Sequence, residues 1–306
     1  MDSIFVIEQL LNGLGYGFML FLLAAGLTLV FGIMDVMNLA HGSLFMAGAY
    51  VAAHVHTRTG SFVLGVVAAI AVVIVLALAL EAALVRRLYG RDHLAQVLAT
   101  FGVILVADDA VKMIWGAAPL MASAPAALSG PVELLPGLLY PSYRLVILAA
   151  GVLVALGLYL LVNHTRVGML VRAGASNRRM AEFMGVRVGQ VFSLVFLLGA
   201  ALAALAGALM GPLTAVQVGM GEEILIPSLV VLVIGGIGSI RGAFVAAMVV
   251  GMVDTIGRAF VPIALRSFLS PTLVSDLAPA IAGLATYALM AGVLAFKPAG
   301  LFPARG

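Results

Sequence analysis

The sequence predicts an all-α integral membrane protein, a polytopic helical bundle of about eight or nine transmembrane segments. Of its 306 residues, 64% are hydrophobic and only 9% are charged, whereas a soluble domain carries about 25% charged residues. The mean hydropathy is +1.21. A β-barrel is disfavoured because barrel strands alternate apolar and polar residues, and residues 71–80 are apolar on every side.

Nine windows free of Asp, Glu, Lys and Arg define the expected segments, because a helix needs about 20 apolar residues to cross the hydrocarbon core. The first ten residues carry Asp2 and Glu8 and no cation. A secretory signal has a basic start, so we expect the first window to be a permanent span. The windows are residues 9–34, 36–57, 59–80, 93–107, 145–165, 188–221, 224–240, 242–253 and 277–296.

The cations are distributed unevenly between the two sets of loops. If nine segments alternate in direction, one set holds 11 of the 16 lysines and arginines. An excess of Lys and Arg marks cytoplasmic loops, so we expect the N-terminus outside and the C-terminus in the cytoplasm. With eight segments, the excess of Lys and Arg in one set of loops would be less clear. We expect residues 1–306 to form a single transmembrane domain.

Two stretches between the windows are longer than a turn. Residues 116–143 contain five prolines and three glycines, which predict an irregular external loop. Residues 166–190 are basic and therefore expected in the cytoplasm. Ser176 and Asn177 are typical helix-start residues, so we expect a short helix from about Asn177 to Met184, ended at Gly185.

The first polar segment, GIMDVMNLAHGSLFMAGAY at residues 32–50, is unusual for a spanning helix. Asp35, Asn38 and His41 are spaced three residues apart and would share one side of a helix. One interpretation is a broken helix whose polar groups and freed backbone line a substrate path. The other is that Asn38 caps the second helix and Asp35 lies in the preceding turn. The candidate path residues here are Asn38, His41, Gly42 and Ser43.

A glycine-rich segment, IGGIGSIRGAF, supplies three further path candidates, Gly235, Gly236 and Gly238. Small residues allow helices to pack closely in a membrane. Alternatively, consecutive glycines weaken a helix and produce a bend beside the path. The segment is not a nucleotide-binding loop, because no βαβ pattern surrounds it.

Acidic residues gather at expected external ends of the segments. Asp108 and Asp109 precede Lys112, and Asp108 is spaced four residues from Lys112 so that the two could pair. Glu222 and Glu223 precede the seventh window. These four acids either form structural pairs and solvated turns or dock an external protein.

Motifs for enzymatic chemistry are missing from the sequence. It contains no HExxH pair, no P-loop and no cysteine, so it predicts no enzyme, no metal site and no ATP-binding site. The cations lie between apolar runs, where membrane topology explains them better than nucleic-acid binding.

The basic segment 166–190 suggests docking of another protein. Arg172, Arg178 and Arg179 flank a short helix with Ala181 and Met184 on its apolar side. Such a knob could insert into a groove on a partner, or it could simply be a solvated cytoplasmic loop.

Several segments together resemble the LivH/LivM-type permease subunits of bacterial branched-chain amino acid ABC importers, and more closely the LivH side. The most specific of them are NLAHG and GGIGSIRGA. The resemblance covers most of the chain and is carried by residues 13–52, 96–105, 115–119, 172–186, 202–212, 230–243 and 297–303.

This resemblance implies a multi-pass protein of the bacterial inner membrane, surrounded by lipid. The expected partners are a second, homologous LivM-like permease, two cytoplasmic ATP-binding subunits that hydrolyse ATP, and a periplasmic solute-binding protein. The substrate would be a branched-chain amino acid or a related amide, urea or aromatic acid. The position matching the ATPase-coupling helix comprises Arg172, Ser176, Asn177, Arg178, Arg179, Ala181, Glu182, Met184 and Gly185.

Two other kinds of transport protein remain as alternatives. A secondary transporter would need an ion-coupling carboxylate, for which Asp35 and Asp254 are the candidates. A passive channel for small solutes would function alone, without ATPases.

Overall fold

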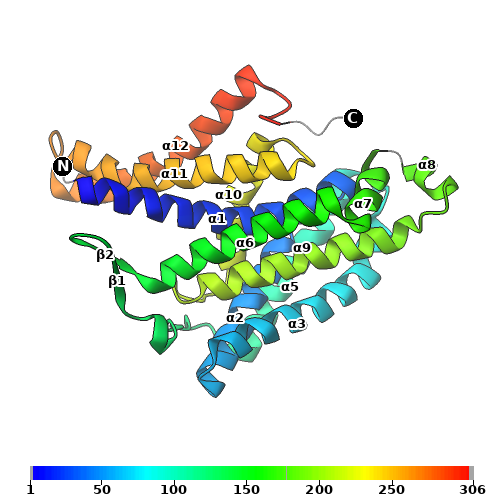
Figure 1. The fold of residues 1–306 in the computed structure, drawn as a ribbon, viewed down its shortest axis with the longest axis horizontal. Coiled ribbons are helices and arrows are strands. Elements are labelled where there is room, and N and C mark those ends of the chain that lie inside the picture. The colour runs from blue at the N-terminus through cyan, green and yellow to red at the C-terminus, as the bar shows by residue number, and fades with distance from the viewer. Residues whose placement is uncertain (1–2, 177, 303–306) are drawn as a thin grey trace.

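The computed structural model describes residues 3–176 and 178–302, which form a bundle whose long helices run mainly along one axis (Figure 1). The first half of the bundle contains α1 (Ser3–Met34), α2 (His41–Thr59), α3 (Phe62–Leu80), a π-helical turn (Glu81–Val85), α4 (Arg86–Leu88) and α5 (His93–Trp115). After a loop with a 3₁₀ turn (Ala126–Leu128) follow the strands β1 (Pro131–Leu135) and β2 (Leu138–Pro141). The remaining helices are α6 (Ser142–His164), α7 (Arg166–Ser176), α8 (Arg178–Phe183), α9 (Val188–Met210), α10 (Met220–Gly235), α11 (Ile240–Leu265) and α12 (Pro271–Phe296).

Six helical stretches among the described residues are long and apolar enough to cross a membrane, so the chain is a multi-pass helical membrane protein. The expected count of eight or nine transmembrane segments also includes α2, α5 and α10. These helices are shorter, less apolar or more charged than the six stretches. The six are Ile4–Met34, Phe62–Leu88, Ser142–His164, Val188–Met210, Ile240–Leu265 and Pro271–Phe296.

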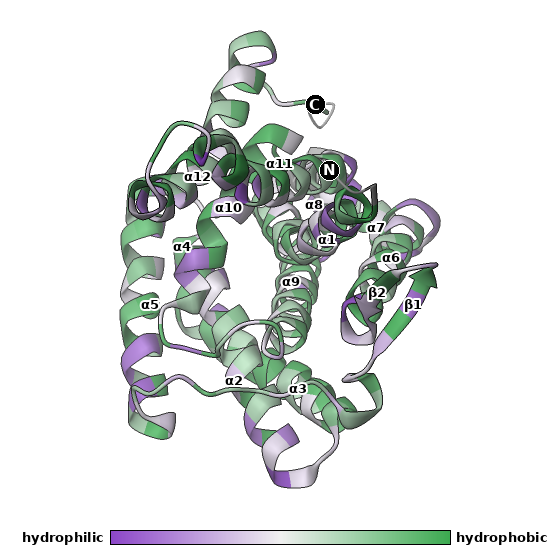
Figure 2. Cartoon of the chain, turned by 90° about the vertical axis from the view of Figure 1, so that its left-hand side faces the viewer, coloured by the Kyte–Doolittle hydropathy of each residue, from purple (hydrophilic) through white to green (hydrophobic). Residues whose placement is uncertain are grey.

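α1 lies at the centre of the bundle, with 83% of its most apolar window buried. By contrast, α3 is the most hydrophobic helix, yet only 22% of its window is buried. A helix that is apolar all round and still exposed is typical of a lipid-facing span. Figure 2 shows hydrophobic residues over most of the helical surface, with polar ones mainly at helix ends and in loops.

Glycine and alanine contacts hold the central helices close together. A Cβ built on Gly251 of α11 would lie 2.5 Å from the backbone nitrogen of Gly17 in α1. Similarly, a Cβ on Gly48 of α2 would lie 2.6 Å from the Cα of Ala204 in α9. These contacts need small residues on both helices, which explains why the sequence is rich in them.

The irregular loop predicted at residues 116–143 is wrong at residues 131–141. β1 and β2 form an antiparallel hairpin there, adding one small sheet to the helical fold. Gly137 supports the turn with a φ of 86°, and Leu138 and Tyr140 alternate with exposed neighbours to bury one face of β2.

The basic segment contains two helices where one was predicted. α8 ends at Phe183, followed by Gly185 with a φ of 83°, close to the expected end. The predicted start falls partly on Asn177, which lies outside the described residues. α7 was missed. It follows α6 through a corner at Thr165, and a Cβ on Gly168 would lie 2.2 Å from the carbonyl oxygen of Val162, so only glycine fits this corner.

The two ends of the bundle differ in character. The hairpin end carries β1 and β2 and the start of α1, at the left of Figure 1. The α8 end carries α7, α8 and the end of α1, at the right. These two names are used below.

Candidate functional site

The segment predicted as unusual breaks the helical path between α1 and α2. α1 ends at Met34, and Asp35 follows in the left-handed region with a φ of 51°. The chain then has no regular structure until α2 begins at His41. Asn38 lies in this connector, where its Oδ1 accepts a hydrogen bond from the backbone nitrogen of Ala40 at 3.1 Å. Asn38 therefore stabilises the turn before the helix rather than sharing a helix face with His41.

Two polar side chains of α5 satisfy the backbone of this connector. Gln96 Oε1 accepts from the backbone nitrogen of Met37 at 2.9 Å, and Thr100 Oγ1 accepts from that of Leu39 at 3.2 Å. Both side chains are fully buried. Sequence reasoning missed them, although two polar residues four apart in an apolar window were a usable signal.

α2 begins inside the bundle rather than at its edge. The buried His41 side chain lies against Gly26 of α1, where a Cβ would be 2.8 Å from His41 Nε2 and 3.0 Å from the carbonyl oxygen of Gly199. Gly199 is about halfway along α9. The first turn of α2 therefore lies near the middle of α9.

α10 starts at the same place. A Cβ on Gly42 would lie 2.4 Å from the carbonyl oxygen of Gly221, and a Cβ on Gly221 would lie 2.3 Å from that of Gly42. The backbones of the first turns of α2 and α10 are therefore in contact inside the bundle. Helix N-termini carry partial positive charge and unmatched N–H groups, so two of them converge here.

Polar side chains beside this contact have unused hydrogen-bonding groups. His41 Nε2, Asn38 Nδ2 and Ser43 Oγ are buried and have no hydrogen-bond partner among the described residues. Buried polar atoms normally bond to protein or to water, so the cluster can receive water or a polar solute. We call Asn38, His41, Gly42, Ser43 and Gly221 the paired helix starts.

The predicted path glycines lie elsewhere. Gly235 ends α10, and Gly236 and Gly238 adopt φ values of 96° and 79° in the turn before α11. This turn is 14 residues along α10 from Gly221, about 21 Å for a helix. The structure therefore does not bring the two predicted halves of the path together.

Tight packing accounts for the glycine turn. A Cβ on Gly235 would lie 2.5 Å from the carbonyl carbon of Gly242, and one on Gly32 would lie 2.3 Å from the Cα of Gly238. The C-terminal segment also docks here, where the backbone nitrogen of Leu301 donates to the carbonyl of Ile234 at 2.8 Å. The GGIGSIRG and KPAGLF motifs thus meet at the α8 end.

The acids predicted at segment ends form a different set of contacts from the expected one. Lys112 Nζ lies 3.0 Å from Asp109 Oδ1, so the spacing-based pair with Asp108 is wrong. Asp108 instead lies beside Glu222 of α10. Glu223 accepts from Gln217 Nε2 at 3.3 Å.

The predicted coupling segment exposes an apolar tip. Phe183 and Met184 are 86% and 78% exposed, and Arg179 is exposed beside them. Ala181, predicted to face a partner, is instead buried against the bundle. The Arg172 guanidinium donates to the carbonyl of Val162 at the end of α6. The exposed side chains available to a partner include Arg179, Phe183 and Met184, which we call the α8 tip. Phe183 was not among the coupling residues predicted from the sequence.

The remaining predicted coupling residues are described only in part. Gly185 is exposed, and Glu182 is exposed on α8. Asn177 lies outside the described residues, and the side chains of Ser176 and Arg178 are not described.

A buried carboxylate connects α9 to the end of α3. Glu81, 1% exposed, lies in the π-helical turn, and its Oε1 accepts from Arg86 Nε at 2.8 Å, Ser193 Oγ at 2.9 Å and Tyr89 Oη at 3.2 Å. α9 follows the α8 tip directly in the chain. Glu81 therefore ties the helix after the tip to the bundle, a role that sequence reasoning missed.

Comparison with known proteins shows the family to which the chain belongs. The family model described as the permease component of the branched-chain amino acid transport system matches residues 9–294. The high-affinity branched-chain amino acid transport system permease protein BraD of Pseudomonas aeruginosa is 30% identical over 265 residues, covering 82% of this chain and 86% of that protein. LivH of Escherichia coli is 26% identical, covering 84% and 87%.

A further relative comes from another organism. The probable branched-chain amino acid transport permease protein LivH of Methanocaldococcus jannaschii is 30% identical, covering 79% of this chain and 78% of that protein. No solved structure matches the chain. The relatives are membrane permease proteins of transport systems and not enzymes. The chain belongs to the family of permease components of branched-chain amino acid transport systems.

Proposed function

We propose that this chain is a transmembrane permease subunit of an ATP-driven importer for branched-chain amino acids or a related small amphipathic solute. The family and its named relatives support the transport of such amino acids. The proposed topology has nine segments in the bacterial inner membrane, with the hairpin end outside and the α8 end in the cytoplasm. The concentration of cations in the loops of the α8 end supports this orientation.

The substrate passes the paired helix starts. The observation that carries this assignment is the backbone contact of Gly42 with Gly221 inside the bundle, beside the unpartnered polar atoms of Asn38 and His41. In other transporters the N-termini of discontinuous helices face the anionic group of the substrate. The first turn of α2 holds no acid, so its N-terminus would favour the carboxylate of an amino acid. The first turn of α10 holds Glu222 and Glu223, which would favour its ammonium group.

ATP is hydrolysed by partner subunits that bind the α8 tip. Phe183 and Met184 would be exposed to the cytoplasm, where a large exposed apolar side chain is unfavourable unless a partner covers it. The contacts of Glu81 with Ser193 and Arg86 would pass a movement of the tip from α9 to α3. A second homologous permease and a periplasmic solute-binding protein would complete the importer.

Reconstitution tests this function directly. The chain is assembled in liposomes with its partner permease, ATPases and binding protein, and uptake of radiolabelled L-leucine is measured with ATP and with a non-hydrolysable analogue. We expect uptake only with hydrolysable ATP. Uptake by this chain alone would instead support a passive channel, and uptake driven by an ion gradient without ATP would support a secondary transporter.

A further inference from the structure

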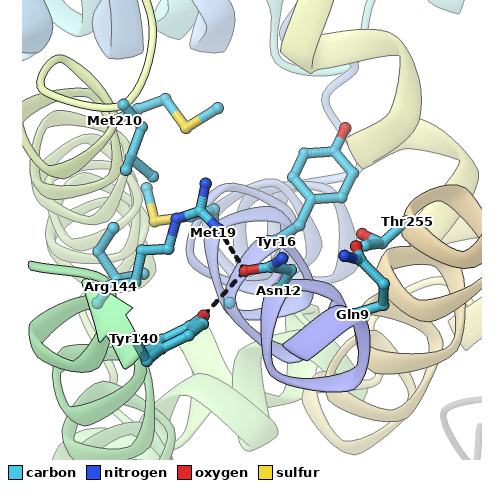
Figure 3. Close-up of a pocket in the computed structure, with 11 residues that line it drawn as sticks. Gln9, Asn12, Tyr16, Met19, Tyr140, Arg144, Met210 and Thr255 are labelled. Carbon is cyan, nitrogen blue, oxygen red and sulfur yellow. Dashed lines mark hydrogen bonds between the residues drawn. The ribbon is translucent and has the colours of Figure 1, made fainter. Parts of the chain in front are cut away.

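A cavity of about 220 Å³ opens at the hairpin end, apart from the paired helix starts (Figure 3). Its polar lining comprises Gln9, Asn12 and Tyr16 of α1, Tyr140 of β2, Arg144 of α6 and Thr255 of α11. We call it the hairpin-end pocket. Asn12 and Gly26 are 14 residues apart on α1, about 21 Å, so the two sites are separate. The volume suits a ligand smaller than the drug-sized molecules that fill typical pockets.

Arg144 is the only charged side chain that lines the pocket among the described residues. Its guanidinium and the Tyr140 hydroxyl both donate to Asn12 Oδ1, the latter at 3.0 Å (Figure 3). The described residues give Arg144 no carboxylate partner. The hydrogen-bond partner of the half-buried guanidinium is the neutral amide of Asn12, which does not neutralise the positive charge. Several N–H groups of the guanidinium remain free to bind a ligand. Such a group favours a carboxylate, which it can bind through two hydrogen bonds.

The surroundings of Arg144 also favour a positive group in the same ligand. Glu8 lies one turn before Asn12 on α1, and its negative charge reaches Tyr140. Gln9 and Thr255 line the side of the pocket opposite Arg144 (Figure 3), and neither side chain has a hydrogen-bond partner among the described residues. Their amide and hydroxyl oxygens can accept from an ammonium group.

The rest of the lining is apolar. Met19, Ile147, Met210 and Leu213 supply it. A bound molecule therefore meets a cation, neutral oxygen acceptors and an aliphatic wall.

We propose that the hairpin-end pocket binds the free zwitterion of a small aliphatic amino acid, with its carboxylate on Arg144 and its ammonium group toward Gln9 and Thr255. The geometry gives the zwitterionic class; the choice of an aliphatic amino acid rests also on the proposed function. Because the pocket is at the hairpin end, it would hold the solute before it reaches the paired helix starts.

A glycine in the pocket wall provides a clean test. Gly15 of α1 lines the cavity, and a Cβ built there meets no atom within 4 Å. The variant Gly15→Leu should therefore fill the cavity while favouring the helix. Gly157→Leu in α6 is the matched control, since a Cβ at Gly157 also has open space and the residue does not line the pocket.

The measurement is equilibrium binding of radiolabelled L-leucine to the purified full-length chain in lipid nanodiscs. We expect Gly15→Leu and Arg144→Gln to weaken binding at least tenfold. Gly157→Leu and Arg58→Gln, an exposed cation away from the pocket, should bind as the unchanged chain does. L-leucinamide, which lacks the carboxylate, should compete at least tenfold less well than L-leucine. Thermal melting of each variant shows whether it is folded, and Gly15→Leu keeps the test valid if Arg144→Gln is not.

Three results would overturn the pocket. They are no L-leucine binding by the unchanged chain, equal binding by Gly15→Leu, or an Arg144-dependent co-purified phospholipid in place of leucine binding. Failure of the proposed function is a separate result, in which the assembled importer does not take up L-leucine with ATP. Suppose that the importer takes up L-leucine normally and that the Gly15→Leu variant binds L-leucine as the unchanged chain does. The proposed function then stands, and the hairpin-end pocket is not the binding site.

Discussion

Gly42 and Gly221 bring the first turns of α2 and α10 into backbone contact inside the bundle, beside the buried side chain of His41. Neither helix begins at the edge of the bundle, so the first-turn backbone N–H groups of both lie in the interior. Irregular backbone is tolerated at membrane depth only where protein or water satisfies it. The paired helix starts thus combine the features needed for a polar solute to cross an apolar bundle.

One methyl group is enough to test this contact. Gly42→Ala should force the two helix starts apart, at a cost of about 1–3 kcal/mol typical of overpacking, and should lower ATP-driven leucine uptake at least tenfold. Thermal melting and uptake are measured together. Gly189→Ala is the control, because a Cβ at Gly189 meets nothing within 4 Å; a normal uptake rate in Gly42→Ala would contradict the close contact.

The connector should depend on α5 for its hydrogen bonds. Gln96→Leu leaves the backbone N–H of Met37 without its partner, and an unsatisfied buried group costs about 1–3 kcal/mol. We expect a lower melting temperature in detergent than for Gln190→Leu, which changes an exposed glutamine on α9. Equal melting of the two variants would show that Gln96 does not hold the connector.

The α8 tip should affect coupling and not folding. Phe183→Ser with Met184→Ser removes exposed side chains, so stability should change by less than about 0.5 kcal/mol. Leucine uptake should fall at least tenfold, with ATP hydrolysis no longer stimulated by substrate. Met121→Ser, an equally exposed methionine at the hairpin end, serves as the control, and wild-type uptake in the double variant would argue against docking at the tip.

The helical segments could be predicted from the sequence because charge-free windows follow from the cost of charges in the bilayer. Each of the nine windows overlaps a helix, although the window 188–221 also includes the connector between α9 and α10. The break near Asp35 was also predictable, since Asn38 and His41 are poorly suited to a continuous spanning helix. The count of spans was not, because α2, α5 and α10 are less apolar or shorter than the other helices.

Contacts between distant segments could not be predicted from spacing. Gly221 gave no local sign that it meets Gly42, and Lys112 had two acids within reach of its own helix face. The structure pairs Lys112 with Asp109 and places Asp108 beside Glu222 of α10, a residue distant in the sequence. The hairpin was missed because prolines dominate its surroundings, while the alternation in β2 covers only four residues.

The chain contains no cysteine, so a single introduced thiol can report on the central claim. Ser43→Cys places a thiol at the paired helix starts, where Ser43 is 7% exposed, and Met121→Cys places one at an exposed site. The rate of modification by a membrane-impermeant, thiol-specific reagent is measured in the assembled importer during ATP hydrolysis, with and without L-leucine. We predict that Ser43→Cys reacts and that L-leucine slows the reaction at least tenfold, while Met121→Cys reacts equally in both conditions. A Ser43→Cys importer that transports leucine normally, yet never reacts or reacts equally with and without leucine, would contradict a substrate path at this place.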